Sequence, residues 1–321
     1  NRVGPKRFLV ASLFAAGGLS LWQSTYPIFG VMAASRILEG VAHLGIVVTA
    51  PALMAQISSD RWRGATMSLW STFFAVSFAL FAWFGIPQVD HLQVSGLFQL
   101  HGTCLILVGG LVWGLLPAPR EDAANPATGS VPKTTFAMAY TDVKVIWPGV
   151  GWLFYTLTFL ALLTILPAQM ADNLRPQMTT AMSLVGIAMS LLVVPLLLAR
   201  LSATTVVQAG FALALVATIL GTGMNVLVLA ILLFSILGMV QGGTFAAVAE
   251  LNQSTAKRTL GYGFMAQTGN LGNLIGTPIL LFILDSAGQT SLLIAVSTIY
   301  GVGVLGLLTL ARRLRALEDG L

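Results

Sequence analysis

Long apolar segments separated by short polar stretches run along almost the whole chain. Ten of these segments are long enough to cross a bilayer, because a helical span needs about 20 mostly apolar residues. They lie at residues 7–25, 28–55, 65–86, 97–117, 145–167, 179–199, 204–222, 226–250, 261–285 and 291–311. The pattern predicts an all-α membrane protein, a polytopic helical bundle with ten spans.

The basic residues indicate how these segments are oriented. If the segments cross the membrane alternately, fourteen of the sixteen Lys and Arg residues fall in gaps on one side. The gaps on the opposite side contain only Arg175, and Arg36 lies inside a segment. By the positive-inside rule, the basic gaps and both ends of this chain are cytoplasmic.

Composition places the chain in the membrane class independently. Hydrophobic residues make up 56% and charged residues 8%, with a mean hydropathy of +0.88, which leaves too little polar surface for a water-soluble globule. The net charge of +5 comes from the cytoplasmic gaps, so it indicates attraction to anionic lipid headgroups and does not indicate nucleic-acid binding. The lone Cys104 excludes an internal disulfide and a cysteine metal cluster.

A change in composition divides the chain into two bundles. Residues 118–143 are rich in Pro, Ala, Asn, Thr, Gly and Ser, which is typical of a flexible cytoplasmic linker. Four spans precede the linker within residues 1–117, and six follow it within residues 144–321. A weak internal repeat matches Arg36-Ile-Leu to Ser235-Ile-Leu. It predicts a pseudo-symmetric transporter fold of six plus six spans, lacking its first two helices here.

The second segment carries ionisable side chains inside an apolar helix. Arg36, Glu39, Gly40 and His43 are spaced at i, i+3, i+4 and i+7, so they share one helix face. Charged groups are costly in hydrocarbon and are expected to face the bundle interior or a water-filled cavity. One interpretation is that Arg36 attracts an anionic substrate or tunes a proton site at Glu39 or His43. The other is that Arg36 and Glu39 pair and lock helix packing, with His43 bonded to a backbone carbonyl.

Further polar candidates lie in the second bundle. The ninth segment places Gln267, Asn270, Asn273 and Thr277 within about a third of the helix circumference. These side chains either line the substrate path or bridge helices beside a glycine-rich surface.

Three more residues of this bundle are candidates by position. Gln241 in the eighth segment is a substrate candidate, and Glu250 near the cytoplasmic boundary is a gate or interface carboxylate. Tyr155 in the fifth segment either contacts substrate or only packs between helices.

Three stretches resemble motifs of the major facilitator superfamily. The opening Asn1-Arg2-Val3-Gly4-Pro5-Lys6-Arg7 is similar to the end of the signature joining that family's second and third helices, with Asn1 where Asp is usual. The run Arg36-Ile-Leu-Glu39-Gly40, followed by His43, resembles its fourth-helix motif, in the form found in the cyanate and nitroimidazole branch. The turn Asp60-Arg61-Trp62-Arg63-Gly64 resembles the connection that follows.

This resemblance implies a multi-pass transporter of the bacterial inner membrane that acts as a monomer. Two helix bundles would rock against each other to expose a substrate site alternately. The cytoplasmic motifs would contribute gating residues, namely Arg2, Gly4, Lys6, Arg61 and Arg63.

The chain has no phosphate-binding loop with its Lys and no nucleophile motif, which disfavours an ATP-driven pump or an enzyme. No cofactor or metal is expected. We therefore expect a secondary active transporter of a small anion, coupled to protons as a symporter. The alternatives are an exporter of drug-like compounds, disfavoured by the missing Gly-Pro pattern in the third segment, and a non-transporting receptor or scaffold.

Overall fold

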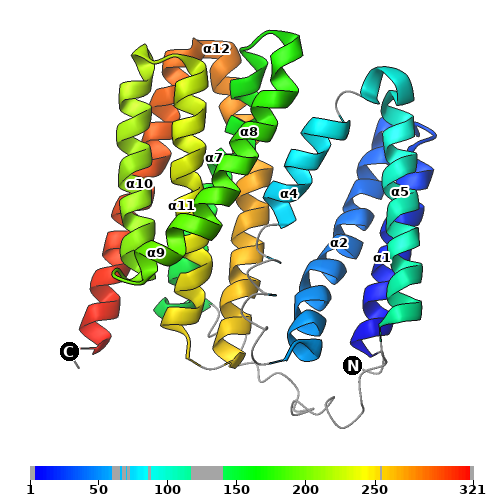
Figure 1. The fold of residues 1–321 in the computed structure, drawn as a ribbon, viewed down its shortest axis with the longest axis horizontal. Helices are drawn as coiled ribbons and strands as arrows, with labels where there is room; N and C mark the ends of the chain where they lie inside the picture. Colours follow the sequence, from blue (N-terminus) through cyan, green and yellow to red (C-terminus); the bar gives the residue numbers. More distant parts are fainter. Residues whose placement is uncertain are drawn as a thin grey trace. The chain divides into compact units, whose positions relative to one another are not determined.

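The computed structural model describes residues 4–59, 66, 70, 73–85, 88–116, 140–253 and 255–318, and every regular element in these ranges is a helix (Figure 1). The chain divides into two compact units. The N-terminal unit comprises Asn1–Phe73 and Phe84–Ser130, and the C-terminal unit comprises Phe74–Trp83 and Val131–Leu321. The domain boundaries expected from composition, including the 118–143 linker, stay predictions, because residues 117–139 lie outside the described ranges.

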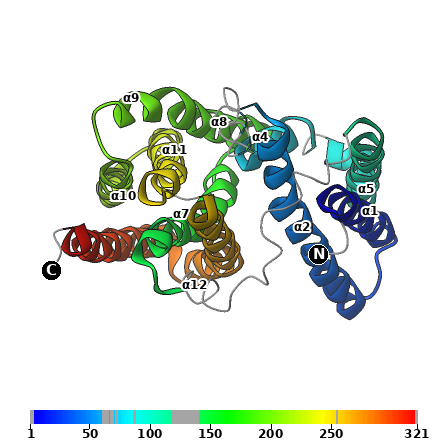
Figure 2. The same ribbon diagram turned by 90° about the horizontal axis from the view of Figure 1, so that it is seen from below.

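The N-terminal unit is built on α1 (Pro5–Gln23), α2 (Phe29–Ile57) and α5 (Val89–Leu115). Helix α1 contacts both of the others and lies between them (Figure 2). Glycines allow this close approach, because a Cβ atom on Gly102 of α5 would lie 2.7 Å from the carbonyl oxygen of Gly17 on α1. The short helix α4 (Phe73–Leu80) and the π-helix η1 (Phe81–Gly85) precede α5 along the chain, but their residues Phe74–Trp83 belong to the C-terminal unit.

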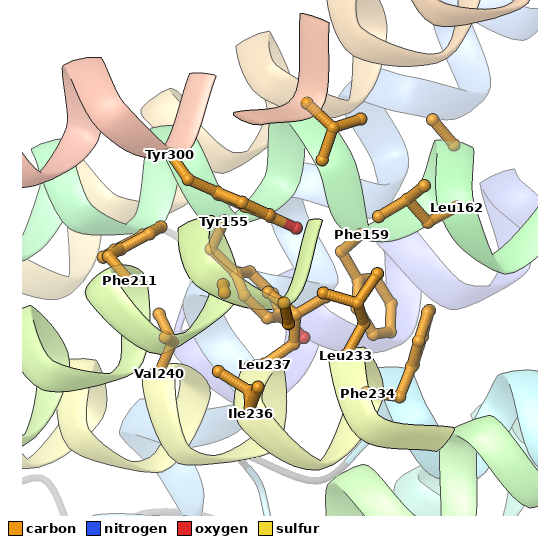
Figure 3. Packing of buried hydrophobic residues seen from close by; sticks show 14 of the residues in the cluster. Tyr155, Phe159, Leu162, Phe211, Leu233, Phe234, Ile236, Leu237, Val240 and Tyr300 are labelled. Carbon is orange, nitrogen blue, oxygen red and sulfur yellow. The ribbon is translucent and has the colours of Figure 1, made fainter. Parts of the chain in front are cut away.

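The C-terminal unit contains longer helices around a continuous apolar core. Its elements are α7 (Val143–Ala168), η4 (Asp172–Leu174), α8 (Arg175–Ala188), η5 (Met189–Val193), α9 (Val194–Leu198), α10 (Ala203–Leu220), η6 (Gly221–Gly223), α11 (Val226–Leu251) and α12 (Thr255–Glu318). Side chains from α7, α10, α11 and α12 meet in the core (Figure 3), among them Tyr155, Phe211, Phe234 and Tyr300. These large side chains are all at most 5% exposed.

Two irregular points have identifiable causes. The π-helix η5 ends two residues before Pro195, which has no backbone N–H and whose ring crowds the preceding turn. Helix α12 has non-helical backbone angles at Gly288, where φ is +78°, a conformation that glycine adopts readily. Gly288 therefore separates two helical segments, residues 255–287 and 289–318.

Seven helical stretches in the described residues are long and apolar enough to cross a membrane. Helices α7, α10 and α11 begin and end within two residues of the predicted segments. The 57-residue stretch Leu260–Ala316 covers the last two predicted segments, on either side of Gly288. The described chain is thus a multi-pass helical bundle, and the total of ten spans stays a prediction.

Candidate functional site

An ion pair lies on the membrane-spanning part of α2. Arg36 Nη1 is 2.6 Å from Glu39 Oε2, one helical turn away. The Glu39 side chain is 10% exposed, whereas that of Arg36 is 54% exposed. Glu39 lies beside Gly40, the middle residue of the 23-residue span Phe29–Pro51. The helix thus holds a carboxylate against its neighbours and leaves the paired guanidinium partly uncovered.

The same guanidinium is held from α1 by a buried amide. Arg36 Nη1 donates to Gln23 Oε1 at 3.1 Å, and Gln23 Nε2 donates to Ser35 Oγ, also at 3.1 Å. Gln23 is 0% and Ser35 is 2% exposed. The Ser35 hydroxyl donates in turn to the carbonyl oxygen of Met32. These bonds fix which end of the amide faces Arg36, because only the carbonyl end can accept from a guanidinium.

Two histidines and an aromatic ring complete this cluster. His43 is close enough to Glu39 and His101 for their charges to interact. His101 Nδ1 lies 3.0 Å from Ser20 Oγ, which also contacts the Phe98 carbonyl oxygen at 2.9 Å. The Phe98 ring centroid is 6.0 Å from Arg36 Cζ, near the limit for a cation–π contact. Arg36, Glu39 and His43 are therefore one electrostatic cluster supported by α1 and α5.

In the C-terminal unit, Tyr155 and Gln241 meet between α7 and α11. The Tyr155 hydroxyl donates to Gln241 Oε1 at 3.0 Å, and the two residues are 3% and 4% exposed. Trp152 stacks on Tyr155 with 4.6 Å between ring centroids and contacts Phe245 edge-on at 5.1 Å. Tyr262 of α12 extends this group at 6.0 Å from Phe245. The pair is therefore part of helix packing, and half-buried Trp152 and Phe245 flank it.

The polar stripe of α12 runs beside a glycine face. Three glycines of α12 pack against the Trp152–Leu157 segment of α7. They are Gly269, Gly272 and Gly276. At 3.6 residues per turn the polar residues lie on the adjacent face of α12. The glycine face of α12 thus packs closely against α7, and the polar stripe lies on a different face of the same helix.

The members of the polar stripe differ in their partners. Gln267 Oε1 accepts from the Tyr140 hydroxyl at 2.7 Å, whereas Asn270 is exposed. Asn273 Oδ1 and Thr277 Oγ1 are buried without a hydrogen-bond partner. A buried polar atom without a partner is costly, so these two atoms are candidates for a ligand or water contact.

Glu250 bridges two helices at the end of α11. Its Oε2 accepts from the backbone N–H of Ala203, the first residue of α10, at 2.8 Å. Ser202 caps the same helix by accepting from the N–H of Thr205. A carboxylate at a helix N-terminus stabilises the helix because it faces unpaired N–H groups and the positive end of the dipole. Glu250 therefore contacts the first residue of α10 from the end of α11, and its gating role stays a prediction.

A second polar connection joins the starts of α7 and α12. Asp142 caps α7 by accepting from the N–H of Lys144 at 3.0 Å, and it pairs with Lys257 Nζ at 2.7 Å. Burial alone would raise the pKa of the Asp142 carboxyl, but the hydrogen bonds and charges of Lys257 and Lys144 outweigh it and lower that pKa below its ordinary value.

The remaining predicted gating residues are only partly described. Gly4 is the N-cap of α1, and Lys6 Nζ donates to the carbonyl oxygen of Leu116 at the end of α5. Lys6 also lies 5.6 Å from the centre of the Trp113 ring. Arg2, Arg61 and Arg63 lie outside the described residues. The described part of this motif therefore joins α1 to α5.

Comparison with known proteins identifies the family. The family model for the Major Facilitator Superfamily matches residues 1–277. The chain belongs to the Major Facilitator Superfamily. The fold of this superfamily supports a secondary transporter in the membrane with a small-molecule substrate.

Solved structures of other superfamily members share the fold. A crystal structure of the transporter FucP in the outward conformation superimposes with a TM-score of 0.68 at 14% identity, covering 97% of this chain and 83% of FucP. The human organic anion transporter MFSD10 (TETRAN) gives a TM-score of 0.62 at 18% identity, covering 95% of this chain and 77% of MFSD10. No match was found among curated protein sequences.

Sequence reasoning missed several members of these clusters. The sequence did not mark Gln23 and Ser20 as site residues, because isolated polar residues near the end of a span are common. His101 was not singled out as a site residue either, and it bonds to Ser20 across the α1–α5 interface while the residue itself is exposed. Asp142 lay inside the predicted linker, although an Asp just before an apolar helix is a typical N-cap that could have located the start of α7.

Proposed function

We propose that the protein is a secondary active transporter that moves a small anion together with a proton by alternating access. The observation that supports this most directly is the Arg36–Glu39 pair, because the guanidinium lies inside an apolar span and is 54% exposed. A charge in such a position is costly and is usually retained for function.

The pair also provides a coupling mechanism. With Glu39 ionised, its charge balances that of Arg36, so an anion gains little from binding. When Glu39 takes up a proton, the Arg36 charge is unbalanced and an anion binds more tightly. Because linkage is reciprocal, a bound anion favours protonation of Glu39 to the same extent. His43, whose charge interacts with that of Glu39, would carry the proton to or from the carboxylate.

This mechanism fixes the charge of the transport cycle. The empty site holds one positive and one negative group, so it is neutral. The loaded site holds Arg36, protonated Glu39 and a monovalent anion, so it is neutral as well. Transport of one proton with one monovalent anion therefore moves no net charge across the membrane.

In the C-terminal unit, we propose that Gln241, Gln267, Asn270 and Asn273 contact the substrate during transport, with Tyr155 orienting Gln241. The buried, unpartnered Asn273 Oδ1 supports a ligand or water contact there. For the membrane arrangement we propose ten crossings in a bacterial inner membrane, with the basic gaps and both ends of this chain cytoplasmic. The Glu-Gly-x-x-His run supports the cyanate and nitroimidazole branch.

Transport by reconstituted protein tests this function. Proteoliposomes with a pH-sensitive dye inside would receive nitrate, succinate, glycerol or tetraphenylphosphonium, and wild type would be compared with Arg36→Gln. Arg175→Gln is the matched control, since Arg175 lies in the exposed Asp172–Arg175 pair outside the cluster. We expect anion-dependent acidification in wild type and in the control but not in Arg36→Gln. The absence of an anion response in wild type would contradict the proposal.

One observation favours a second candidate function, the export of drug-like compounds. Trp152, Phe245 and Tyr262 form an aromatic group, and each ring is only partly buried. Aromatic surfaces bind lipophilic cations. A response to tetraphenylphosphonium that survives Arg36→Gln but is lost in Trp152→Ala would support the exporter.

A further inference from the structure

The donors of Arg36 are used unevenly. A guanidinium has five N–H groups, two of them on Nη1. Nη1 contacts both Glu39 Oε2 at 2.6 Å and Gln23 Oε1 at 3.1 Å, so both of its hydrogens are engaged. Within the described part of the chain, the hydrogen bonds of Arg36 involve Nη1 alone. The Nε and Nη2 donors, which share one edge of the planar group, therefore remain available.

This free edge has a defined chemical preference. Two parallel N–H groups in one plane match two oxygens of a planar oxyanion and form a bidentate pair. A spherical anion such as a halide has one accepting atom, so both N–H groups would have to bend toward the same point, and the two bonds would be weaker. The exposed position of the Arg36 side chain leaves this edge accessible.

Gln23 is the residue that holds the edge in place. Glu39 alone would leave the guanidinium free to rotate about one contact and to offer Nη2 or Nε to the carboxylate. Gln23 adds a second contact from another helix, and its amide is itself anchored on Ser35 Oγ. Since Gln23 is 0% exposed, packing limits its movement as well.

We propose that Gln23 is a positioning residue that directs the Nε/Nη2 edge of Arg36 toward substrate, and that the site selects planar oxyanions, such as carboxylates or nitrate, over halides. This inference rests on the proposed anion transport and specifies its substrate class.

The test compares two monovalent anions of strong acids, nitrate and bromide, in proteoliposomes of the whole chain. We expect the KM for nitrate to be about tenfold lower than that for bromide in wild type, as for one charge-assisted hydrogen bond. Gln23→Met, which keeps the length of the side chain, should remove this difference and change kcat less than about twofold. Ser12→Ala is the matched control, because Ser12 is also a buried polar residue of α1 but lies outside the Arg36 cluster.

A nitrate preference that persists in Gln23→Met, or its absence in wild type, would overturn the inference. If Gln23→Met does not fold, Ser35→Ala removes the anchor of the amide and should reduce the preference about threefold, and an unchanged preference there would equally overturn it.

A transport-independent measurement separates this inference from the proposed function. If wild type transports neither anion, the transport proposal fails, and modification of Arg36 by phenylglyoxal then reports on the role of Gln23. We expect Gln23→Met to increase the rate of Arg36 modification, followed by mass spectrometry, at least about twofold through loss of one hydrogen bond. Ser12→Ala should not change this rate. An unchanged rate in Gln23→Met would exclude the positioning role.

Discussion

Gly276 of α12 packs directly against the carbonyl oxygen of Leu157 on α7. Gly272 makes a similar contact one turn earlier, against the Thr156 hydroxyl. Helix backbones can approach this closely only where the side chain is a hydrogen atom. The contact fixes the rotation of α12 and therefore the direction in which its polar stripe projects.

We predict that Gly276→Ala destabilises the protein by about 1–3 kcal/mol, because the new methyl group would overlap the Leu157 backbone and force the helices apart. Thermal unfolding in detergent would measure the effect. Gly263→Ala is the control on the same helix, since no atom lies within 4 Å of a Cβ atom built there. Equal melting temperatures for the two variants would show that the α7–α12 contact does not limit stability.

The coupling mechanism predicts that Glu39→Gln separates anion transport from proton transport. Glutamine imitates the protonated carboxyl, so Arg36 would stay unbalanced and would bind an anion at every pH. We expect anion exchange to persist while proton-driven accumulation is lost. Isotope exchange and accumulation of labelled nitrate in proteoliposomes would measure the two activities. Accumulation that continues in Glu39→Gln would assign the coupled proton to another group.

Electroneutrality gives an independent prediction for the unmodified protein. Since the empty and the loaded site carry the same net charge, a membrane potential should not drive uptake of a monovalent anion. A potassium gradient with valinomycin would impose the potential while both sides are held at one pH. Uptake that rises with a potential positive inside would require a cycle that moves net negative charge into the vesicle.

Hydropathy predicted α7, α10 and α11 to within two residues, and helical spacing placed Arg36, Glu39 and His43 on one face of α2, because both are local properties. The sequence could not predict that Gln23 of α1 reaches Arg36, since that contact depends on how α1 and α2 pack. It also left open whether Glu250 gates or stabilises. Glu250 and Ala203 are 47 positions apart in the sequence. Whether they meet depends on how the connection between α10 and α11 places the two helices.

The Asp142–Lys257 pair predicts a pH-dependent contribution to stability. The pKa of Asp142 is lowered in the folded protein, so the pair stabilises the fold above the ordinary value of about 3.9. This contribution is lost as the pH falls through the lower folded value. The Lys257 side chain is 38% exposed, so we expect at most about 1 kcal/mol.

Asp142→Asn tests this pair, because asparagine can still cap α7 but carries no charge. The variant should melt below wild type at pH 7, and the difference should be smaller near pH 3, below the ordinary pKa of an Asp carboxyl. Asp172→Asn removes a carboxylate whose side chain is 89% exposed and should change neither melting temperature. A difference for Asp142→Asn that is the same at both pH values would rule out ionisation of Asp142 as its cause.

Glu250 offers a way to distinguish a gate from a helix cap. A cap acts on the folded protein in every conformation, so its loss lowers stability without selecting a step of transport. Because the carboxylate accepts from Ala203 N–H at 2.8 Å, we predict that Glu250→Ala costs about 0.5–2 kcal/mol and that Glu250→Gln, which retains an acceptor, costs less. Both variants should transport at the wild-type rate per folded molecule. If Glu250→Gln instead melts like wild type but changes the ratio of inward to outward transport, then the charge of Glu250 acts in gating and the cap is secondary.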